Sequence, residues 1–250
     1  MSGNIQQSFA YNGLDFSIIE DCTAVQVAGN AVVLWNTIKN QKDYIWSKKG
    51  GYCMATSNYN VSLVACAEYG LDPEVHIYRC TGGGQSPQLQ DSFKMDTTVK
   101  CIGMAFSRCG KYLLMIGGVP DFRISIYDIE SSKKLVIPET KLLCKPEEFL
   151  QAKFNPANKS QFVILSQTTL YSYTINPAYD VTETGDQKIL GEAFRLEHIE
   201  YKDENPDLTF GKLIWDQYGR VHICTDLPMI IMVNAKTCQL ENTVNLTSTP

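Results

Sequence analysis

Three side chains in this sequence are suited to proton transfer near neutral pH, namely His76, His198 and His222. His76 and His222 fall inside short apolar runs, where a histidine with a structural role is the more frequent case. His222 and Cys224 share one face of their run, but a zinc site takes about four ligands. We therefore predict no catalytic residue, no bound metal and no cofactor.

Two glycine-rich stretches raise the question of phosphate binding. Residues 81–85 read Thr-Gly-Gly-Gly-Gln, but no lysine follows at the spacing of a phosphate-binding loop and no helix begins there. Gly117 and Gly118 lie between two apolar runs, where a tight bend is needed. We interpret both stretches as loops that connect secondary-structure elements.

Charge and hydropathy exclude two classes of partner. The 22 basic and 27 acidic side chains give a net charge of −5. Nine acidic residues against three basic ones fall in residues 174–209, and no basic stripe suited to nucleic acid remains elsewhere. The longest strongly apolar run, residues 227–233, is far shorter than the ~20 residues that span a bilayer. We predict neither nucleic-acid binding nor membrane insertion.

The cysteines indicate the redox state of the cellular compartment in which the protein resides. There are nine, an odd number, and no two have the spacing of a Cys-x-x-Cys pair. Residues 1–10 carry neither the positive charges nor the apolar run of a secretion signal. We expect free thiols in an intracellular, reducing environment, because disulfide frameworks belong to secreted proteins.

The elements that position these side chains are strands, since short runs rich in Val, Ile, Tyr and Phe alternate with turn residues throughout. The runs are residues 23–28, 31–35, 62–67, 74–78, 101–106, 112–116, 123–127, 162–165, 170–173, 213–215, 221–224 and 229–233. Residues 146–154 offer one helix, because Pro146 suits a first helical position. The second half of that stretch reads equally well as a strand. The sequence predicts an all-β chain.

A repeat organises the strands: an apolar strand, a polar or glycine turn, a second strand, a loop, and a third strand that ends in an aromatic residue. The third strands end near residues 35, 78, 127, 173 and 233, at separations of 43, 49, 46 and 60 residues. A WD-repeat blade takes ~40–45 residues, so we predict a WD40-type β-propeller with degenerate repeats. The predicted repeats are residues 17–47, 51–96, 99–143, 148–200 and 210–245, with residues 174–209 as an acidic inter-strand insertion. These four to five blades suggest part of a propeller of about seven blades.

The residue sequences of the repeats resemble those of one family of ciliary WD-repeat proteins. The matching segments are residues 25–30, 65–68, 72–78, 106–114, 117–122, 123–128, 154–156, 212–215 and 229–234. The most specific of them is Gly-Gly-Val-Pro-Asp-Phe at 117–122. The family is that of cilia- and flagella-associated proteins 43 and 44, and residues 212–240 favour the first.

The resemblance implies a non-enzymatic scaffold in the axoneme of motile cilia and flagella. Members of the family form the tether and tether head that hold inner-arm dynein f (I1) motor domains near the doublet microtubule. The expected partners are the paralogous WD-repeat protein, dynein f and the doublet. Family members are long chains with coiled coils after their propellers, and this sequence has no coiled coil. We therefore expect it to be a segment of a longer chain or a short relative.

The candidate partner-binding residues are Asp121, Phe122 and Arg123, which follow the glycine loop at the start of a third strand. The plain alternative for Phe122 is that it begins a strand and packs between blades. Two other functions stay open. One is a general cytosolic adaptor in a ubiquitin ligase or a trafficking complex. The other is a propeller hydrolase, which needs carboxylates or histidines gathered around the central channel.

Overall fold

The computed structural model describes residues 17–19, 22–80, 86–97, 99–137, 141–181 and 187–246. Within these ranges the chain forms twenty β-strands and one short 3-10 helix. The strands make five antiparallel sheets of four, and in each sheet the strands pair in chain order. No helix in the described ranges is long and apolar enough to cross a bilayer. The glycine-rich stretch 81–85 and residues 182–186 of the acidic segment lie outside the described residues.

We number the sheets blades 1 to 5. Blade 1 contains β1 (Ser17–Ile19), β2 (Thr23–Ala28), β3 (Ala31–Asn36) and β4 (Gln41–Trp46). Blade 2 contains β5 (Tyr52–Asn58), β6 (Leu63–Glu68), β7 (Glu74–Arg79) and β8 (Gln88–Lys94). Blade 3 contains β9 (Cys101–Phe106), β10 (Tyr112–Gly117), β11 (Ile124–Asp128) and β12 (Lys133–Lys134). Blade 4 contains β13 (Phe149–Asn155), β14 (Asn158–Ser166), β15 (Thr169–Val181) and β16 (Gln187–Lys202). Blade 5 contains β17 (Phe210–Trp215), β18 (Arg220–Thr225), β19 (Met229–Asn234) and β20 (Gln239–Asn245).

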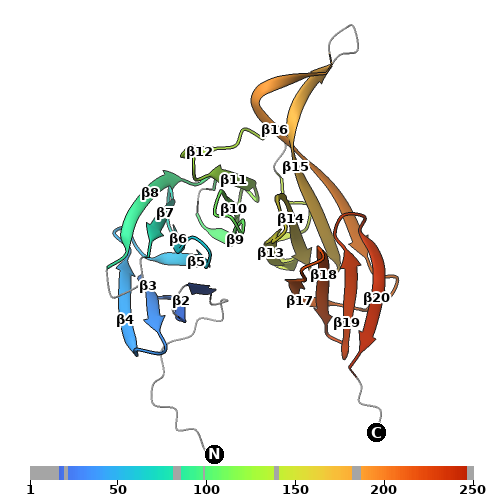
Figure 1. Cartoon of the computed structure of the whole chain (residues 1–250), viewed down its shortest axis with the longest axis horizontal. Helices are drawn as coiled ribbons and strands as arrows, with labels where there is room; N and C mark the ends of the chain where they lie inside the picture. The colour runs from blue at the N-terminus through green and yellow to red at the C-terminus, as the bar shows by residue number, and fades with distance from the viewer. Residues whose placement is uncertain are drawn as a thin grey trace, which may run out of the picture.

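The blades follow one another around an arc that stays open between blades 1 and 5 (Figure 1). The first strand of each blade faces the centre, where β1, β5, β9, β13 and β17 border a shared central channel. The core lies between blades, because four apolar clusters each join one blade to the next. A single four-stranded sheet cannot bury both of its faces, so each blade is stabilised mainly by its neighbours.

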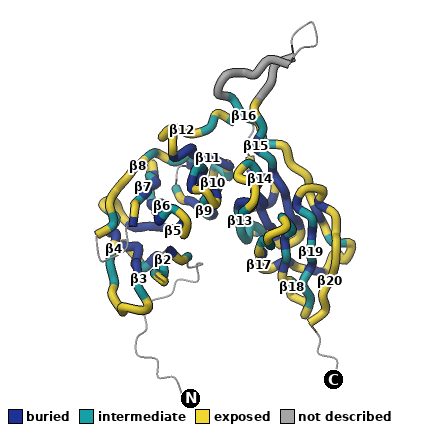
Figure 2. The backbone as a smooth tube through the Cα atoms, viewed as in Figure 1, coloured by how far each residue is buried: buried dark blue, intermediate teal, exposed yellow. Residues whose placement is uncertain are grey.

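This packing explains the continuous apolar runs in the sequence. Strands β6 and β10 are buried at every position, because another blade covers each of their two faces. The buried stretches lie in the middle of the blades and the exposed ones on their outer strands (Figure 2). An antiparallel strand covered on one face alternates apolar and polar residues, whereas one covered on both faces does not.

Two predicted elements take a different form in the structure. The helix proposed at residues 146–154 is a 3-10 turn at Pro146–Glu148, followed directly by β13 (Phe149–Asn155). Pairing of β13 with β14 supplies the backbone hydrogen bonds that a helix would otherwise have formed. The acidic segment 174–209, predicted as an insertion between strands, supplies much of the two long strands β15 and β16 themselves. They pair from Thr169↔Lys202 out to Val181↔Gln187.

Candidate functional site

The loop between β10 and β11 carries the three candidate binding residues, and its backbone is held tightly. The N–H of Gly118 donates to the carbonyl of Lys100 at 2.8 Å, and the N–H groups of Asp121 and Phe122 both donate to the carbonyl of Gly118 at 3.1 Å. Phe122 has a left-handed φ of 46°. The loop therefore presents the three residues from a fixed backbone.

The structure places the side chain of Phe122 in a different environment from those of Asp121 and Arg123. Phe122 is half-buried and packs against the apolar cluster between blades 3 and 4, as the plain alternative expected. Asp121 and Arg123 line a cavity of about 750 Å³ instead, and the side chain of Arg123 is exposed. The left-handed φ of Phe122 turns the backbone between its two neighbours, so the three side chains do not follow the simple alternation of a strand.

This space, here termed the interblade cavity, lies between β11 and β12 of blade 3 and β15 and β16 of blade 4. Its charged lining residues are Asp96, Asp121, Arg123, Lys134 and Lys141. Lys134 pairs with Asp96, whose second carboxylate oxygen accepts a hydrogen bond from Ser125 Oγ at 3.0 Å. The cavity thus carries charges of both signs on a rigid frame, which suits recognition of a polypeptide surface.

An aromatic wall closes the blade 4 side of the interblade cavity. The Tyr173 and His198 rings lie with their centroids 5.6 Å apart. Burial raises the pKa of Tyr173 well above its ordinary range, so its hydroxyl stays neutral. That hydroxyl oxygen is buried and has no hydrogen-bond partner. The two described rings of this wall therefore present aromatic surface, and they form no charged acid–base pair with each other.

The central channel has a different lining. It encloses about 750 Å³, and among the described residues that border it the ionisable side chains are those of Lys153 and Lys212. A propeller hydrolase would place carboxylates or histidines here to transfer protons or bind a metal. The described lining holds no such group, so the channel is a poor candidate for an active site.

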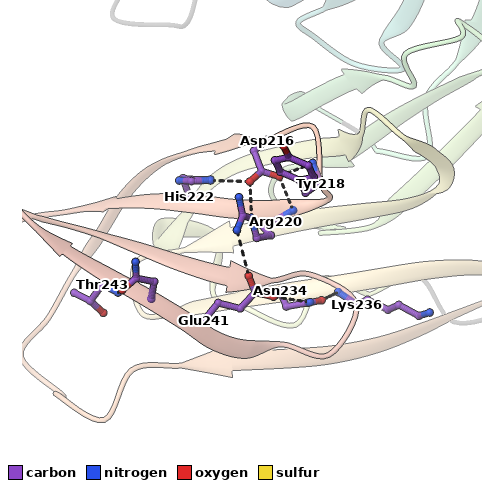
Figure 3. Close-up of polar contacts among 9 residues, drawn as sticks. Asp216, Tyr218, Arg220, His222, Asn234, Lys236, Glu241 and Thr243 are labelled. Atoms are coloured by element: carbon purple, nitrogen blue, oxygen red, sulfur yellow. Dashed lines mark hydrogen bonds and ion pairs between the residues drawn. The ribbon is translucent and has the colours of Figure 1, made fainter.

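A polar cluster in blade 5 holds one of the three histidines (Figure 3). Asp216, in the turn between β17 and β18, accepts hydrogen bonds from the backbone N–H groups of Tyr218 and Arg220 at 2.8 and 3.1 Å. Its other oxygen lies 2.6 Å from Arg220 Nε and 3.1 Å from His222 Nε2. Burial alone would raise the pKa of Asp216, but these donors outweigh it and hold that pKa well below its usual range.

The sequence pattern paired His222 with Cys224, whereas the structure pairs it with Asp216. The signal that could have identified this pair is the short turn at residues 217–219, which brings Asp216 beside the start of the next strand. His76 likewise faces a carboxylate, with its Nε2 3.2 Å from Glu68 Oε1. His198 is exposed on an outer strand. None of the three forms a nucleophile–base pair with a described neighbour.

Comparison with known proteins gives one consistent sequence match. No family model matches the chain. The chain is 25% identical over 173 residues to cilia- and flagella-associated protein 43 of Mus musculus, covering 68% of this chain and 10% of that protein. It is 23% identical over 159 residues to the same protein of Xenopus laevis, covering 64% of this chain and 9% of that one. The chain thus spans about a tenth of the length of the curated relatives that it matches, and the predicted resemblance is confirmed.

Solved structures agree on the fold. A chain in the crystal structure of a mitotic checkpoint complex matches with a TM-score of 0.61 and 12% identity, over 93% of this chain and 66% of that one. The β-propeller domain of Cps50 (Swd1) from Myceliophteria thermophila matches with a TM-score of 0.60 and 11% identity, over 92% of this chain and 72% of that domain's chain. This chain has five consecutive four-stranded antiparallel sheets. Together with these structural neighbours, they confirm that it is an all-β chain of the WD40-type β-propeller class.

Proposed function

We propose that this chain is a non-enzymatic scaffold of the axoneme in motile cilia and flagella. Within that structure it contributes propeller blades to the tether or tether head that links inner-arm dynein f (I1) motor domains to the doublet microtubule. The observation that carries the proposal is the similarity to cilia- and flagella-associated protein 43 in two vertebrates, over about two thirds of the chain. The proposed partners are the paralogous WD-repeat protein, dynein f and the doublet.

The physical properties of the chain support a scaffold. Four interblade cores make the blades a stiff array, and the loops at their ends form broad faces on which partners can dock. The net charge of −5 gives no general attraction to an acidic microtubule surface. Binding must therefore rely on local complementarity, and the mixed charges of the interblade cavity can supply it.

A general cytosolic adaptor remains the second candidate, since ubiquitin-ligase receptors and trafficking complexes use the same fold. The two functions differ in where the protein resides. We expect a tagged protein, expressed in motile ciliated cells, to stay with the doublets after extraction of cilia with detergent and high salt. Recovery only in the soluble cell body would contradict the axonemal role and favour the adaptor.

The same assay tests the binding residues. Substitution of Asp121 and Arg123 together by alanine removes one partly buried acidic side chain and one exposed basic side chain from the lining of the interblade cavity, and it leaves Phe122 packed against the interblade core. Loss of a central charged contact costs about 2 kcal/mol or more, which weakens binding more than about tenfold. We expect the variant to appear in the salt extract while the unaltered protein stays bound.

The control for this variant is the pair Asp207→Ala and Lys236→Ala, which removes one exposed charge of each sign outside the interblade cavity. We expect the control to stay with the doublets. If both variants are retained equally, Asp121 and Arg123 are not partner contacts, although the scaffold role stands. If the unaltered protein itself is soluble, the scaffold role fails.

A further inference from the structure

A group of potential metal ligands lies in blade 2, where β6 ends and β7 begins. Glu68 is the last residue of β6, and Glu74 and His76 are the first and third residues of β7. One donor atom from each of the three side chains lies within 4.8 Å of the other two. The pairing Ala67↔Val75 places Glu68 opposite Glu74, with His76 two residues further along the same face.

The electrostatics of this group are unusual because its most buried member is a carboxylate. Glu68 is only 2% exposed, and its Oε2 has no hydrogen-bond partner. The Nδ1 of His76 is also buried and without a partner. Like charges opposite each other destabilise a strand pair, and a buried carboxylate needs a cation or several donors beside it.

The nearby cation is Lys49, from the linker between blades 1 and 2, and it satisfies the group only in part. Its Nζ lies 2.7 Å from Glu74 Oε1 but 4.0 Å from Glu68 Oε2. The side chain of Lys49 is 52% exposed. It can therefore swing into solvent and leave two carboxylates and one imidazole facing the same point.

We propose that Glu68, Glu74 and His76 bind a divalent zinc ion, which displaces the ammonium group of Lys49. One imidazole nitrogen and two carboxylate oxygens are zinc donors, and zinc sites with three protein ligands complete their coordination with water. Zinc bonds of about 2.0–2.2 Å at tetrahedral angles place ligand atoms about 3.4 Å apart. Zinc binding therefore requires side-chain rotations that bring the three donor atoms, now within 4.8 Å of one another, to that spacing. Calcium takes six to eight oxygen ligands and magnesium about six, so this donor set favours zinc over both.

Histidine side-chain NMR of the purified chain, titrated with zinc chloride, tests the proposal. The sequence has three histidines, so each imidazole can be followed separately. We expect zinc to shift the signals of His76 and to saturate at one equivalent, while His198 and His222 stay unchanged. Magnesium and calcium chloride should leave all three unchanged.

Variants sharpen the test. Even partners in the outer shell of a metal contribute about 10- to 100-fold to its affinity, so Glu74→Gln or His76→Gln should weaken zinc binding by more than about tenfold. Both positions are less buried than Glu68, which reduces the risk of unfolding. Lys49→Met should tighten binding, because it removes the competing ammonium group. The matched control is His222→Gln, which alters the other carboxylate–histidine pair and should not change affinity.

Cobalt distinguishes this site from adventitious binding by thiols. All nine cysteines are free, and Cys22, Cys109 and Cys224 are exposed. Cobalt bound by thiolate shows a strong near-ultraviolet charge-transfer band, which the proposed nitrogen and oxygen ligands do not give. A thiolate band at one equivalent, unshifted His76 signals in excess zinc, or a Lys49→Met variant that binds zinc no more tightly would each overturn the proposal. The proposal is independent of the axonemal role.

Discussion

At the scale of single residues, Asp216 shows how this fold fixes its histidines. Its two carboxylate oxygens accept from two backbone N–H groups, and from Arg220 and His222. The Arg220 guanidinium also lies 5.1 Å from the Tyr218 ring centroid and 3.8 Å from Glu241. Both carboxylate oxygens of Asp216 thus accept hydrogen bonds within or beside the turn between β17 and β18. The cluster therefore holds the turn together and fixes the position of its histidine.

The lowered pKa of Asp216 predicts how pH acts on stability. A carboxyl group whose pKa is lowered on folding stabilises the fold above its ordinary pKa of about 3.9, and that contribution is lost as the pH falls toward the lowered value. We expect Asp216→Asn to lower the free energy of unfolding at pH 7 by about 1–2 kcal/mol, discounted for partial exposure. The difference in free energy of unfolding between the unaltered protein and Asp216→Asn should become smaller below about pH 4.

Urea unfolding at pH 7 and pH 3, for the unaltered protein and Asp216→Asn, measures this effect. Asp207→Asn serves as the control, because Asp207 is exposed and lies outside the cluster; its midpoint should change little at pH 7. The free energies of unfolding of the unaltered protein and Asp216→Asn should differ more at pH 7 than at pH 3. An equal difference at both pH values would contradict the assignment of the stabilisation to an ionised carboxylate.

The candidate residues show what sequence order alone misses. Asp121, Phe122 and Arg123 are adjacent in sequence, but Phe122 packs in the core while its two neighbours line the interblade cavity. The left-handed backbone at Phe122 departs from the simple alternation of a strand, so the sequence pattern could not have predicted that division. The group around His76 was missed because Glu68, Glu74 and His76, although close in sequence, follow no recognised metal-ligand spacing, and because Lys49 lies in a separate linker. Only the register of the β6–β7 hairpin brings the glutamates and the histidine to one face.

At the scale of elements, polar side chains join consecutive blades in addition to the apolar cores. Asn58 of blade 2 donates to the carbonyl of Ser107 in blade 3 at 2.7 Å. Gln161 of blade 4 donates to the carbonyl of Ala235 in blade 5 at 2.9 Å, and its own carbonyl accepts from Asn155 at 2.7 Å. Such buried bonds fix the relative position of two sheets, because a shift by one residue would leave these groups unpaired.

This interpretation predicts a marked loss of stability from Gln161→Met, which keeps the size of the side chain and removes its hydrogen bonds. Gln161 is 7% exposed, so the partners that lose their bonds lie in a buried site. Leaving buried polar groups unsatisfied costs about 1–3 kcal/mol. Chemical denaturation measures the change, and Gln167→Met, at an exposed position of blade 4, should cost less than about 0.5 kcal/mol. Equal effects at the two positions would contradict a role for this bond between blades.

The strands themselves were largely predictable, and the exceptions have physical causes. The second strand of a blade forms an apolar run because neighbouring blades cover both of its faces, as in β6 and β10. The outer strands carry little pattern: β20 is exposed at every residue, so no alternation marks it. For residues 146–154 the helix prediction was wrong, whereas the alternative of a strand in the second half is confirmed by the pairing of β13 with β14. Local propensity alone could not decide between the two, because the partner strand decides it.

At the scale of the whole molecule, the open arc leaves one face of blade 1 and one face of blade 5 without a neighbouring blade among the described residues. The aromatic residue near the end of the third strand packs toward the preceding blade in Tyr78, Tyr127 and Tyr173. Trp35 holds the same position in blade 1, where no described blade precedes it, and its indole contacts Asn40 and Lys42 of its own blade. The number of blades in a ring depends on how such faces meet, and the repeat spacing in one sequence does not contain that information.

The outer face of blade 5 gives the last prediction, because β19 is apolar on both faces although the described blades cover only one of them. Ile231 is 1% exposed and packs toward blade 4, whereas the adjacent Ile230 is only partly buried on the opposite face. Ile231→Ala should lower the free energy of unfolding by about 3 kcal/mol, and Ile230→Ala by less than about 1 kcal/mol. The two variants delete the same atoms from neighbouring positions of one strand, so their difference in chemical denaturation isolates coverage by a second blade. Equal losses would mean that the far face of blade 5 is already packed. If the difference is found, a partner sheet that docks on this face should raise the cost of Ile230→Ala toward that of Ile231→Ala.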